Sequence, residues 1–394
     1  MKLPSIKDKE LDFSGKVVLL REDLNVPMDE SGLVTDESRI QEAVPTIRYL
    51  IQKGARTVVM THIGRPEGKV IDSLRTEPVA AKLSMMLKQD VNSLKECIGG
   101  EVEASIKKVK DGEVIFLENL RFHKEEEEND EKFAKALASL GDIYVNDAFA
   151  VCHRNNASVT GIPKHLPSYA GLLLEKEIKT LAGALEKPKR PFVVVLGGAK
   201  VSDKIGVIRN LAQKADKILI GGAMMFTFYR SRGFEVGSSK VEPDMVSVAD
   251  DLINEFNGKI MLPVDVVVAD RAAGNARRDV VTASEIPKGW LGLDIGPESI
   301  KIFCKEISEA RTIIWNGPLG LFELDMFAEG TVAIAKAVSE MTSRATTIIG
   351  GGDTLAAVDK AGLKGRFSHS STGGGAMLEF LEGKTLPGVA ALQN

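Results

Sequence analysis

Short, mostly apolar runs alternate along the chain with amphipathic segments. Continuous apolar and β-branched runs are typical of strands that are buried on both faces of a sheet. Such runs predict strands at 17–20, 57–60, 114–117, 143–145, 193–196, 218–220, 264–268, 312–315 and 347–349. The segments between them carry helix formers at helical spacing, for example at 131–140 and 331–341. This alternation predicts an α/β fold with parallel sheets that are covered on both faces.

The length of the chain predicts two domains, because 394 residues exceed one typical hydrophobic core. The break is expected near 163–191, where Pro163, Pro167, Pro188 and Pro191 surround a helical segment at 170–185. Prolines at both flanks of a helix favour a helical connector between domains.

The residues that follow the expected strands differ between the two halves. Open parallel sheets bind ligands at the carboxyl ends of their strands. In the N-terminal half these ends are rich in Arg, His, Asp and Asn, at 21–25, 62–65, 118–121 and 146–148. In the C-terminal half they are rich in Gly, with Lys and Asp, at 197–200, 221–223, 316–318 and 350–353. The difference predicts two domains that bind two different ligands.

Three glycine clusters mark the C-terminal half, at 315–323, 350–354 and 371–375. A glycine turn between a strand and a helix lets backbone N–H groups approach an anion closely. The clusters therefore predict a nucleotide-phosphate site that is built from backbone. The chain has neither the G-x-x-x-x-G-K-[ST] loop nor the G-x-G-x-x-G fingerprint, and it lacks the kinase motifs H-R-D and D-F-G. A kinase activity would need a different nucleotide fold.

Arg21, Arg65, Arg121 and Arg154 lie shortly after apolar runs, and Arg39 lies further along the loop after the first run. The guanidinium group offers a rigid fork of donors that matches phosphate and carboxylate. Several of them converging would hold a small dianionic or trianionic substrate. Each one alone is as well explained as a surface residue or a salt-bridge partner.

His62 and His153 adjoin two of these arginines and could act as acid–base groups. Phosphoryl transfer to an anionic nucleophile needs little proton movement, so we interpret both as donors to substrate oxygens. Asp23 and Asn25 could fix substrate hydroxyls, although Asp23, close to Pro27, also suits a plain turn.

Lys200 and Lys204 follow the strand at 193–196 and a Gly-Gly pair. Their spacing predicts that both lie on one face of the first turn of a helix. Two cations at a helix N-terminus are unfavourable unless an anion binds there, so the pair favours a functional site.

Asp353 follows three glycines and could hold Mg²⁺ beside phosphate oxygens. It could equally cap the helix, and both roles are compatible. Glu323 could accept hydrogen bonds from ribose hydroxyls or be a plain surface carboxylate. The acidic run at 125–128 is interpreted as a solvated surface segment.

Composition narrows the class of protein. A net charge of −4 and the lack of a basic stripe argue against nucleic-acid binding. Cys97, Cys152 and Cys304 have no metal-binding spacing, and their odd count favours reduced thiols in a cytosol. The N-terminus has no apolar h-region, so no signal peptide is expected. No apolar run approaches the ~20 residues of a membrane span.

Together these motifs resemble the phosphoglycerate kinase family over essentially the whole chain. The matching stretches are 21–27, 62–66, 118–122, 145–149, 153–154, 197–204, 315–323, 350–354, 371–375 and 386–388. The resemblance implies two Rossmann-like, doubly wound parallel-sheet domains joined by a helical hinge. The 3-phosphoglycerate domain would span 1–169, the connecting helix 170–186 and the nucleotide domain 187–377, with a tail at about 378–394 that packs back onto the first domain.

The resemblance implies reversible, Mg²⁺-dependent phosphoryl transfer between 1,3-bisphosphoglycerate and ADP, giving 3-phosphoglycerate and ATP, as in glycolysis and gluconeogenesis. It implies a cytoplasmic monomer without nucleic-acid or membrane partners. The substrate ligands would be Asp23, Asn25, Arg39, His62, Ile63, Gly64, Arg65, Arg121 and Arg154. The nucleotide ligands would be Lys204, Gly292, Glu323, Gly351, Gly352, Asp353 and Thr354, with Asp353 on the metal. Arg39, Lys200, Lys204 and the amides of 373–375, with Gly374 and Gly375, would surround the transferring group.

The chain departs from the family pattern at five positions, none among the residues expected to meet the phosphoryl group. Glu22 replaces a usually apolar residue. Ala150 and Cys152 stand where Gly and Ala are favoured, Asn156 where His is frequent, and Ala223 where a third glycine is usual near the adenine pocket. These changes could alter substrate affinity or nucleotide preference.

The mechanism expected is direct in-line transfer without a covalent enzyme intermediate, on closure of the two domains. Two rival functions remain. A dinucleotide-dependent dehydrogenase would share the layered architecture but lacks the glycine fingerprint and leaves the strand-end arginines unexplained. A non-catalytic phosphate-binding protein would not need Arg39, Lys200, Lys204 and Asp353 together.

Overall fold

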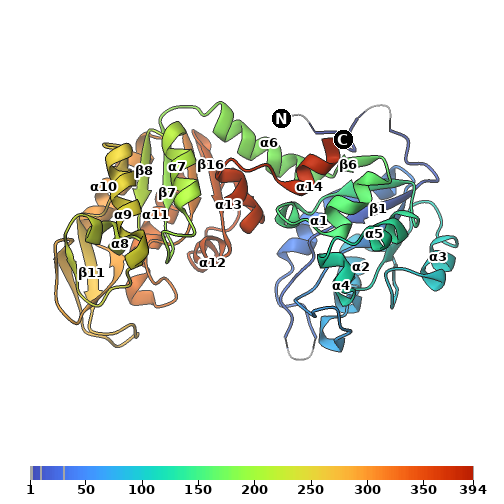
Figure 1. The fold of residues 1–394 in the computed structure, drawn as a ribbon, viewed down its shortest axis with the longest axis horizontal. Helices are drawn as coiled ribbons and strands as arrows, with labels where there is room; N and C mark the ends of the chain where they lie inside the picture. The colour runs from blue at the N-terminus through green and yellow to red at the C-terminus, as the bar shows by residue number, and fades with distance from the viewer. Residues whose placement is uncertain (1–2, 9–10, 30–31, 394) are drawn as a thin grey trace. The chain divides into compact units, whose positions relative to one another are not determined.

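The computed structural model describes residues 3–8, 11–29 and 32–393. The chain forms two compact units, which we call unit 1 (Met1–Lys179 with Thr385–Asn394) and unit 2 (Thr180–Lys384). The boundary between them falls inside α6 (Leu172–Glu186), the helix that the flanking prolines predicted. Each unit contains a six-stranded parallel sheet with helices packed against it, which confirms the predicted fold class (Figure 1).

Unit 1 is built on a sheet of strand order β3-β4-β2-β1-β5-β6. Its strands are β1 (Val17–Arg21), β2 (Arg56–Met60), β3 (Val91–Ser93), β4 (Val114–Phe116), β5 (Ile143–Asn146) and β6 (Ser168–Ala170). Its helices are α1 (Ser38–Gln52), α2 (Glu77–Leu87), α3 (Gly100–Ile106), α4 (Lys124–Glu127), α5 (Glu131–Ala138) and α14 (Pro387–Ala390).

The centre of this sheet is β1, which pairs in parallel with β2 on one side and β5 on the other. Val18, Leu19 and Leu20 are all fully buried, as expected for a strand with both faces covered. The outer strands β3 and β6 were not predicted, because each has only three residues and β3 is only partly buried. Short edge strands carry little apolar pattern.

Unit 2 has a sheet of order β10-β8-β7-β15-β16-β17. Its strands are β7 (Phe192–Leu196), β8 (Lys217–Ile220), β10 (Ile260–Met261), β15 (Thr312–Asn316), β16 (Thr346–Gly350) and β17 (His369–Ser371). Its helices are α7 (Ile205–Lys214), α8 (Met225–Ser231), α9 (Val246–Glu255), α10 (Pro297–Glu309), α11 (Glu329–Glu340), α12 (Gly352–Lys360) and α13 (Gly375–Leu381).

Unit 2 also has two smaller sheets. In one, β11 (Asp265–Ala269) pairs antiparallel with β12 (Arg278–Thr282) and β14 (Leu291–Ile295). In the other, β9 (Glu235–Val236) pairs with β13 (Glu285–Ile286). The expectation that the run at 264–268 belongs to a parallel sheet was therefore wrong. All five residues of β11 are buried, and a buried antiparallel strand has the same apolar run as a parallel one.

The C-terminal segment divides between the two units. α13 packs against α7, and Asn210 Nδ2 donates to the Leu381 carbonyl at 2.7 Å, so residues 378–384 belong to unit 2. The segment that belongs to unit 1 begins at Thr385, later than the expected 378. There Gly388 N donates to the Cys152 carbonyl at 2.8 Å, and α14 (red) lies beside elements of the N-terminal half (Figure 1).

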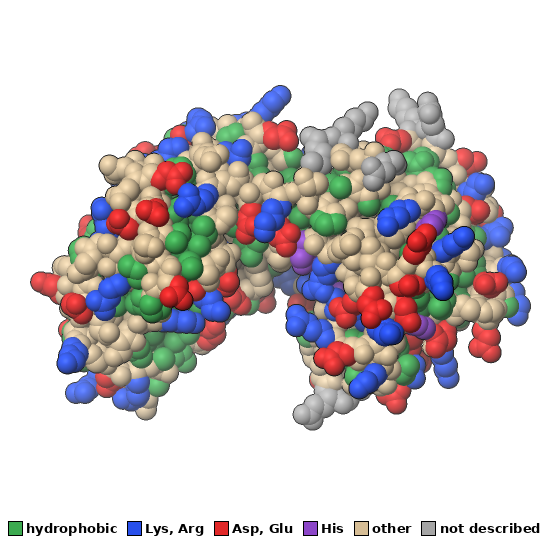
Figure 2. Space-filling view, viewed as in Figure 1, with side chains coloured by type: hydrophobic (Ala, Val, Ile, Leu, Met, Phe, Trp, Pro, Cys, Tyr) green, Lys and Arg blue, Asp and Glu red, His purple; other side chains and the backbone are tan. Residues whose placement is uncertain are grey.

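The surface carries charges of both signs. Figure 2 shows Lys and Arg side chains mixed with Asp and Glu side chains on the face in view. Among the described residues, none of the helices combines the length and the apolar character that crossing a bilayer requires.

Candidate active site

In unit 1 the loops after β1 and β2 are joined by a side-chain bridge. Asn25 Oδ1 accepts a hydrogen bond from Gly64 N at 2.9 Å, and Thr61 Oγ1 accepts one from Leu24 N at 2.9 Å. Gly64 has φ +62°, and a Cβ there would press on Leu74. This conformation is open to glycine, so the turn exposes its backbone next to Asn25.

The loop after β4 is fastened to the same turn. Asn119 Oδ1 accepts from Ile63 N and from Arg121 N, both at 3.1 Å, and its amide donates to the Ile63 carbonyl at 2.8 Å. Arg121 Nη1 donates to the Gly64 carbonyl at 2.8 Å. Asn119 was missed as a positioning residue in the sequence, because its partners are distant in the chain.

The strand ends of unit 1 gather positive charge around one histidine. His62 is 3% exposed, and Arg21 Nη2 lies 3.2 Å from its Nδ1. Burial lowers the pKa of His62 well below its usual value, and four nearby guanidinium groups lower it further, those of Arg21, Arg121, Arg154 and Arg39. The ring is therefore neutral at physiological pH. These four arginines, two of which follow the first predicted strand, share one electrostatic neighbourhood that favours an anion.

The remaining candidates of unit 1 differ in exposure. Asp23 is partly buried and pairs with the half-buried Arg39, which begins the first turn of α1. Asp23 Oδ1 lies 4.0 Å from His62 Nδ1. Arg154 is half-buried, and Arg65 is exposed. These side chains and turns lie in one connected region: Asp23, Asn25, Arg39, His62, Ile63, Gly64, Arg121 and Arg154. Arg65 forms no hydrogen bond or ion pair with them in the described part of the chain.

The acidic run at 125–128 is not uniformly solvated as expected. Glu126 is 1% exposed, accepts from Ser158 Oγ at 2.6 Å and from Ser158 N at 2.9 Å, and helps to keep Arg21 charged. Arg21 Nε in turn donates to Ser158 Oγ at 2.8 Å. The hydroxyl bridges the two charges, so this glutamate supports the arginine cluster from behind.

Four of the five departures from the family pattern lie in unit 1. Glu22 is 1% exposed and Cys152 is fully buried, with Asn146 Nδ2 at 3.5 Å from its sulfur. Asn156 is 8% exposed, and its amide donates to the Glu126 carbonyl at 3.3 Å. Ala150 is partly exposed. Three of these four side chains are buried, and none is among the expected substrate ligands.

In unit 2 the strand order reverses between β7 and β15, the position where open α/β sheets bind ligands. Gly197 N donates to the Asn316 carbonyl at 3.0 Å across these two strand ends. A Cβ on Gly197 would clash with the Pro318 carbonyl, and one on Gly317 would clash with the Gly197 carbonyl. The two loops meet backbone to backbone, and this close approach requires glycine.

The lysine pair after β7 is arranged differently from the sequence expectation. Helix α7 begins at Ile205 with Lys204 as its N-cap, so Lys200 and Lys204 precede the helix and do not share its first turn. The cause is a tight turn: Lys204 N donates to the Val201 carbonyl at 2.8 Å, and Glu242 Oε2 accepts from Val201 N at 2.5 Å.

The two lysines also differ in environment. Lys200 is exposed, whereas Lys204 is 8% exposed and donates to Asn316 Oδ1. Burial lowers the pKa of Lys204 to about 8, while Asp203 and Asp353 act in the opposite direction. Asn316 was not among the predicted site residues. It holds Lys204 and also donates to the Gly350 carbonyl at 2.8 Å, which joins the ends of β15 and β16.

The turn after β16 presents backbone amides. Gly351 is the N-cap of α12 with φ +95°, so Asp353 is a first-turn residue and not the cap. Thr354 is buried, and its hydroxyl accepts from Gly317 N at 2.7 Å. Gly352 and Asp353 are exposed, with free space where a Cβ of Gly352 would lie. The carboxylate of Asp353 thus stands beside the open N-terminus of a helix.

A cavity of about 210 Å³ lies next to this turn, and Asp353 and Glu323 are among its lining residues. Its floor is small or apolar, with Gly292, Ala223 and Phe226. A Cβ on Gly292 would run into the Phe226 ring, so the glycine keeps this wall flat. An apolar slot with polar groups at one end suits a planar base that carries a charged tail.

The last glycine cluster precedes α13. Gly374 is its N-cap with φ +49°, and Gly375 is its exposed first residue. No Cβ contact limits Gly374, so its glycine is required by conformation alone. α13 has seven residues, and its Ala376 N–H donates to the Gly373 carbonyl at 2.9 Å. In the described structure the N–H groups of Gly374 and Gly375 are the ones that remain to face an anion.

The fold and these two sets of groups define a class: a two-unit α/β protein of phosphate chemistry, with cationic side chains in one unit and glycine amides in the other. The profile of the family "Phosphoglycerate kinase" matches residues 8–384. The chain belongs to the phosphoglycerate kinase family. Members of that family are phosphotransferases, so this chain is an enzyme and a kinase.

Individual relatives give the extent of the similarity. The phosphoglycerate kinase of Picosynechococcus sp. is 53% identical over 387 residues, covering 98% of this chain and 97% of the relative. The chloroplastic phosphoglycerate kinase of Volvox carteri is 54% identical over 387 residues, covering 97% of this chain and 84% of the relative. The cytosolic one of Triticum aestivum is 52% identical over 388 residues, covering 97% and 96%.

Solved structures agree with the fold. Phosphoglycerate kinase from Coxiella burnetii superposes with a TM-score of 0.90 at 40% identity, covering 100% of this chain and 99% of the other. The enzyme from Pyrococcus horikoshii OT3 superposes with a TM-score of 0.86 at 38% identity, covering 98% of both chains.

Proposed function

We propose that this chain catalyses reversible, Mg²⁺-dependent phosphoryl transfer between 1,3-bisphosphoglycerate and ADP, giving 3-phosphoglycerate and ATP. The observation that carries the proposal is the electrostatic setting of His62: four arginines from different positions along the chain act on one buried, neutral ring. Such a concentration of positive charge is costly without an anionic ligand. A small molecule that carries both a phosphate and a carboxylate matches that concentration of positive charge.

In unit 1, Arg39, Arg121 and Arg154 would bind the phosphate and carboxylate oxygens of 3-phosphoglycerate, together with Arg65. The neutral His62 would donate or accept one hydrogen bond and would not act as a general base, because its pKa is held low. Asp23 and Asn25 would fix the substrate hydroxyl, with the backbone of Ile63 and Gly64 completing the turn. The hydrogen bond from Gly64 N to Asn25 Oδ1 supports this grouping of Asn25 with the Gly64 turn.

In unit 2, the nucleotide base would lie in the cavity against Gly292, with Glu323 near the ribose. The amides of Gly351 and Gly352, with Lys204 and Thr354, would face its phosphates. The exposed Asp353 carboxylate beside an open helix N-terminus fits Mg²⁺, which takes carboxylate and phosphate oxygens together. When bound, the ion would neutralise phosphate charge and orient the phosphoryl group.

The transfer itself would need no covalent enzyme intermediate. The 3-phosphoglycerate carboxylate is already anionic, so catalysis consists of positioning and charge neutralisation. Lys200, Arg39 and the amides of Gly374 and Gly375 would surround the equatorial oxygens of the transferring group. Because these groups belong to different units, the reaction would require the units to close on the substrates, which would also exclude water from the acyl phosphate.

A coupled assay with 3-phosphoglycerate and MgATP tests the proposal directly. Turnover that requires all three components is expected. Absence of turnover in a folded preparation would leave the non-catalytic phosphate-binding function. Calorimetry with NAD and with MgADP separates the dehydrogenase alternative: MgADP is expected to bind and NAD is not.

We also propose that the enzyme acts as a cytoplasmic monomer, as most simply fits two units that contain the complete set of proposed ligands. Analytical ultracentrifugation in the presence and absence of MgATP measures whether the enzyme is a monomer. A dimer that dissociates with loss of activity would overturn it. Cytosolic and chloroplastic relatives are both known, so cell fractionation is needed to test the cytoplasmic location.

A further inference from the structure

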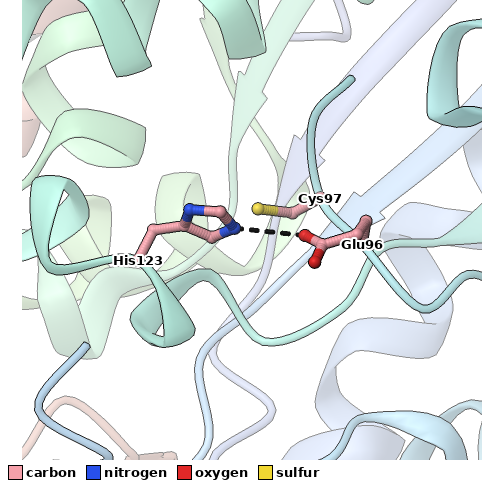
Figure 3. A group of neighbouring side chains, drawn as sticks. All are labelled: Glu96, Cys97 and His123. Carbon is pink, nitrogen blue, oxygen red and sulfur yellow. Dashed lines mark hydrogen bonds and ion pairs between the residues drawn. The ribbon is translucent and has the colours of Figure 1, made fainter. Parts of the chain in front are cut away.

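A second group of polar side chains lies in unit 1, outside the proposed ligands. Glu96 and Cys97 lie between β3 and α3, and His123 lies at the start of α4 (Figure 3). One donor atom from each residue lies within 4.8 Å of the other two. Cys97 has no metal-binding spacing in the sequence, because His123 is remote from it in the chain and is brought near only by the fold.

The donor set has the chemistry of a zinc site. Thiolate, imidazole and carboxylate are the three ligand types that Zn²⁺ takes in proteins. Glu96 Oε2 and His123 Nε2 are 3.2 Å apart. Two ligands at about 2.0–2.1 Å from a tetrahedral ion are separated by roughly 3.3 Å, so this pair already has the spacing that coordination requires.

The surroundings of the thiol favour a cation. Cys97 is fully buried, and the carboxylates of Glu96 and Glu126 act on its thiol electrostatically. A buried thiol among carboxylates is a poor nucleophile, which argues against a redox role for Cys97. The same negative field attracts a divalent ion, and coordination deprotonates the thiol.

The backbone holds the three residues in place without an ion. Leu94 N donates to the Phe116 carbonyl at 2.8 Å, and Glu118 N donates to the Glu96 carbonyl at 3.4 Å, which fastens the 94–97 loop to the exit of β4. The His123 ring stacks on Phe133 with centroids 5.2 Å apart. A preorganised ligand set loses little conformational entropy on binding.

We propose that Glu96, Cys97 and His123 form a Zn²⁺ site with one further coordination position for water. Bound zinc would link the loop after β3 to the segment that continues from Arg121. It would therefore stabilise unit 1 against local opening, in proportion to zinc occupancy. The site differs from the position proposed for Mg²⁺ at Asp353 in its residues and in its donor types. Zinc takes thiolate and imidazole ligands, whereas Mg²⁺ takes carboxylate and phosphate oxygens.

The test uses the full chain, stripped of metal by chelation. Equilibrium dialysis against Zn²⁺ measures stoichiometry, and titration with Co²⁺ reports a thiolate-to-cobalt charge-transfer band. We expect one ion per chain and a band that disappears in Cys97→Ser. His123→Gln and Glu96→Gln should each weaken binding by at least about tenfold, since even outer-shell changes at metal sites reach that size. Cys304→Ser, which removes a partly exposed thiol in unit 2, is the matched control and should bind normally.

Several results would overturn the zinc site. These are no stoichiometric binding by the wild type, a cobalt band that survives in Cys97→Ser, or equal zinc affinity in wild type and His123→Gln. His123 and Glu96 are more exposed than Cys97, so their variants test the site even if Cys97→Ser fails to fold. Zinc should also raise the midpoint of thermal unfolding in wild type and Cys304→Ser but not in His123→Gln.

Discussion

Unit 1 and unit 2 present different polar groups on the same kind of scaffold. At the strand ends of unit 1 the groups are side chains, such as Arg121 and Asn25, that both form hydrogen bonds with the Gly64 turn. At the strand ends of unit 2 they are mainly backbone amides exposed by glycine, with Gly197 and Gly317 in direct contact. Both sheets are parallel and six-stranded, so the difference arises from the residues after the strands.

The contrast has a physical consequence. In a site built from side chains, each arginine can be removed by substitution without changing the backbone. Such a substitution should lower the affinity for the ligand and leave the fold intact. A backbone site has no side chain to remove, so it is disrupted by adding atoms, as at Gly351 and Gly352. Substitutions that remove a charge should therefore test unit 1 and Lys200, and substitutions that add a methyl group should test the remainder of unit 2.

The largest effect is expected from Lys200→Ala. Lys200 is exposed and acts on Glu242 only through space, so its removal should leave folding intact and remove a positive charge from the transferring group. Loss of one preorganised electrostatic donor typically lowers kcat by about 10²–10³. Steady-state kinetics should show that loss with modest changes in KM. Lys305→Ala, an exposed lysine on α10, is the control, and a near-normal kcat for Lys200→Ala would rule out its assigned role.

A smaller loss is expected from Arg39→Ala. Arg39 pairs with Asp23, so its removal weakens substrate binding and also frees a carboxylate that repels the substrate. We expect KM for 3-phosphoglycerate to rise by about tenfold or more, the equivalent of about 1.4 kcal/mol, and kcat to fall. Arg48→Ala, an exposed arginine on the same helix, should behave as wild type. An unchanged rate for Arg39→Ala would contradict the assignment.

The glycine turn of unit 2 can be tested with two methyl groups. Gly351 has φ +95°, so Gly351→Ala should cost about 1–3 kcal/mol of stability. Gly352 has free space around it, so Gly352→Ala should fold normally but raise KM for MgATP, by about tenfold if one phosphate contact of about 1.4 kcal/mol is lost.

The chain supplies matched controls for this pair. Gly99 (φ +104°) and Gly100 stand in the same positions before α3, away from the proposed nucleotide site. Gly99→Ala should lower stability as Gly351→Ala does, and Gly100→Ala should leave both stability and KM unchanged. Denaturation curves and nucleotide titrations measure these outcomes. A Gly352→Ala enzyme with normal nucleotide affinity would mean that phosphate does not approach this amide.

A pH dependence is expected from a buried acid pair, Glu22 and Asp147. Glu22 Oε1 and Asp147 Oδ2 are buried, and in the described structure no N–H or O–H group donates to either oxygen. The two carboxyl groups are close enough to hydrogen-bond to each other if one of them carries a proton. One shared proton supplies the missing donor. Asp147 also accepts from Leu173 N at 2.8 Å and Leu174 N at 3.0 Å, at the start of α6.

Burial raises the pKa of Asp147 to about 6, and burial together with Asp147 raises the pKa of Glu22 well above its usual value, against the opposing charge of Arg21. Raised carboxyl pKa values stabilise the fold below about pH 4 and lose that contribution as pH rises through the folded values. For Asp147 this loss should run from about pH 4 to about pH 6 and amount to about 3 kcal/mol, and the raised pKa of Glu22 should continue it at higher pH.

Glu22→Gln should flatten this fall, because one of the two titrating groups is removed. The readouts are hydrogen exchange at Leu173 and Leu174 and unfolding followed across the pH range. Glu128→Gln, an exposed acid on the surface, should keep the wild-type slope. A wild-type slope in Glu22→Gln would show that the pair does not share a proton.

Much of the fold was predictable because buried parallel strands have a strong apolar signature. The main strands of both sheets, α6, α5 and α11 were predicted to within a few residues. The run at 264–268 was assigned to the wrong kind of sheet, because burial on both faces hides the strand direction. The early return of the tail was also misplaced, since Leu381 is kept in unit 2 by a contact with Asn210 that no local pattern shows.

The candidate residues were likewise proposed as a set, from residue types at strand ends, and their roles stay predictions. Their supporting residues were not. Asn119, Asn316 and Glu126 act through hydrogen bonds to residues that are distant in sequence. The helical placement of Lys200 and Lys204 was wrong, because a turn capped by Glu242 delays the start of α7.

By itself, the sequence determined where polar groups follow apolar runs, and so which residues each sheet edge could offer to a ligand. These are local properties of composition and spacing. Only the tertiary structure decided which of them share an electrostatic neighbourhood, as the four arginines around His62 do, and which are held apart or buried. It also brought His123 to Cys97 and Glu22 to Asp147. Burial and through-space charge depend on packing between distant segments, and a linear pattern does not encode that packing.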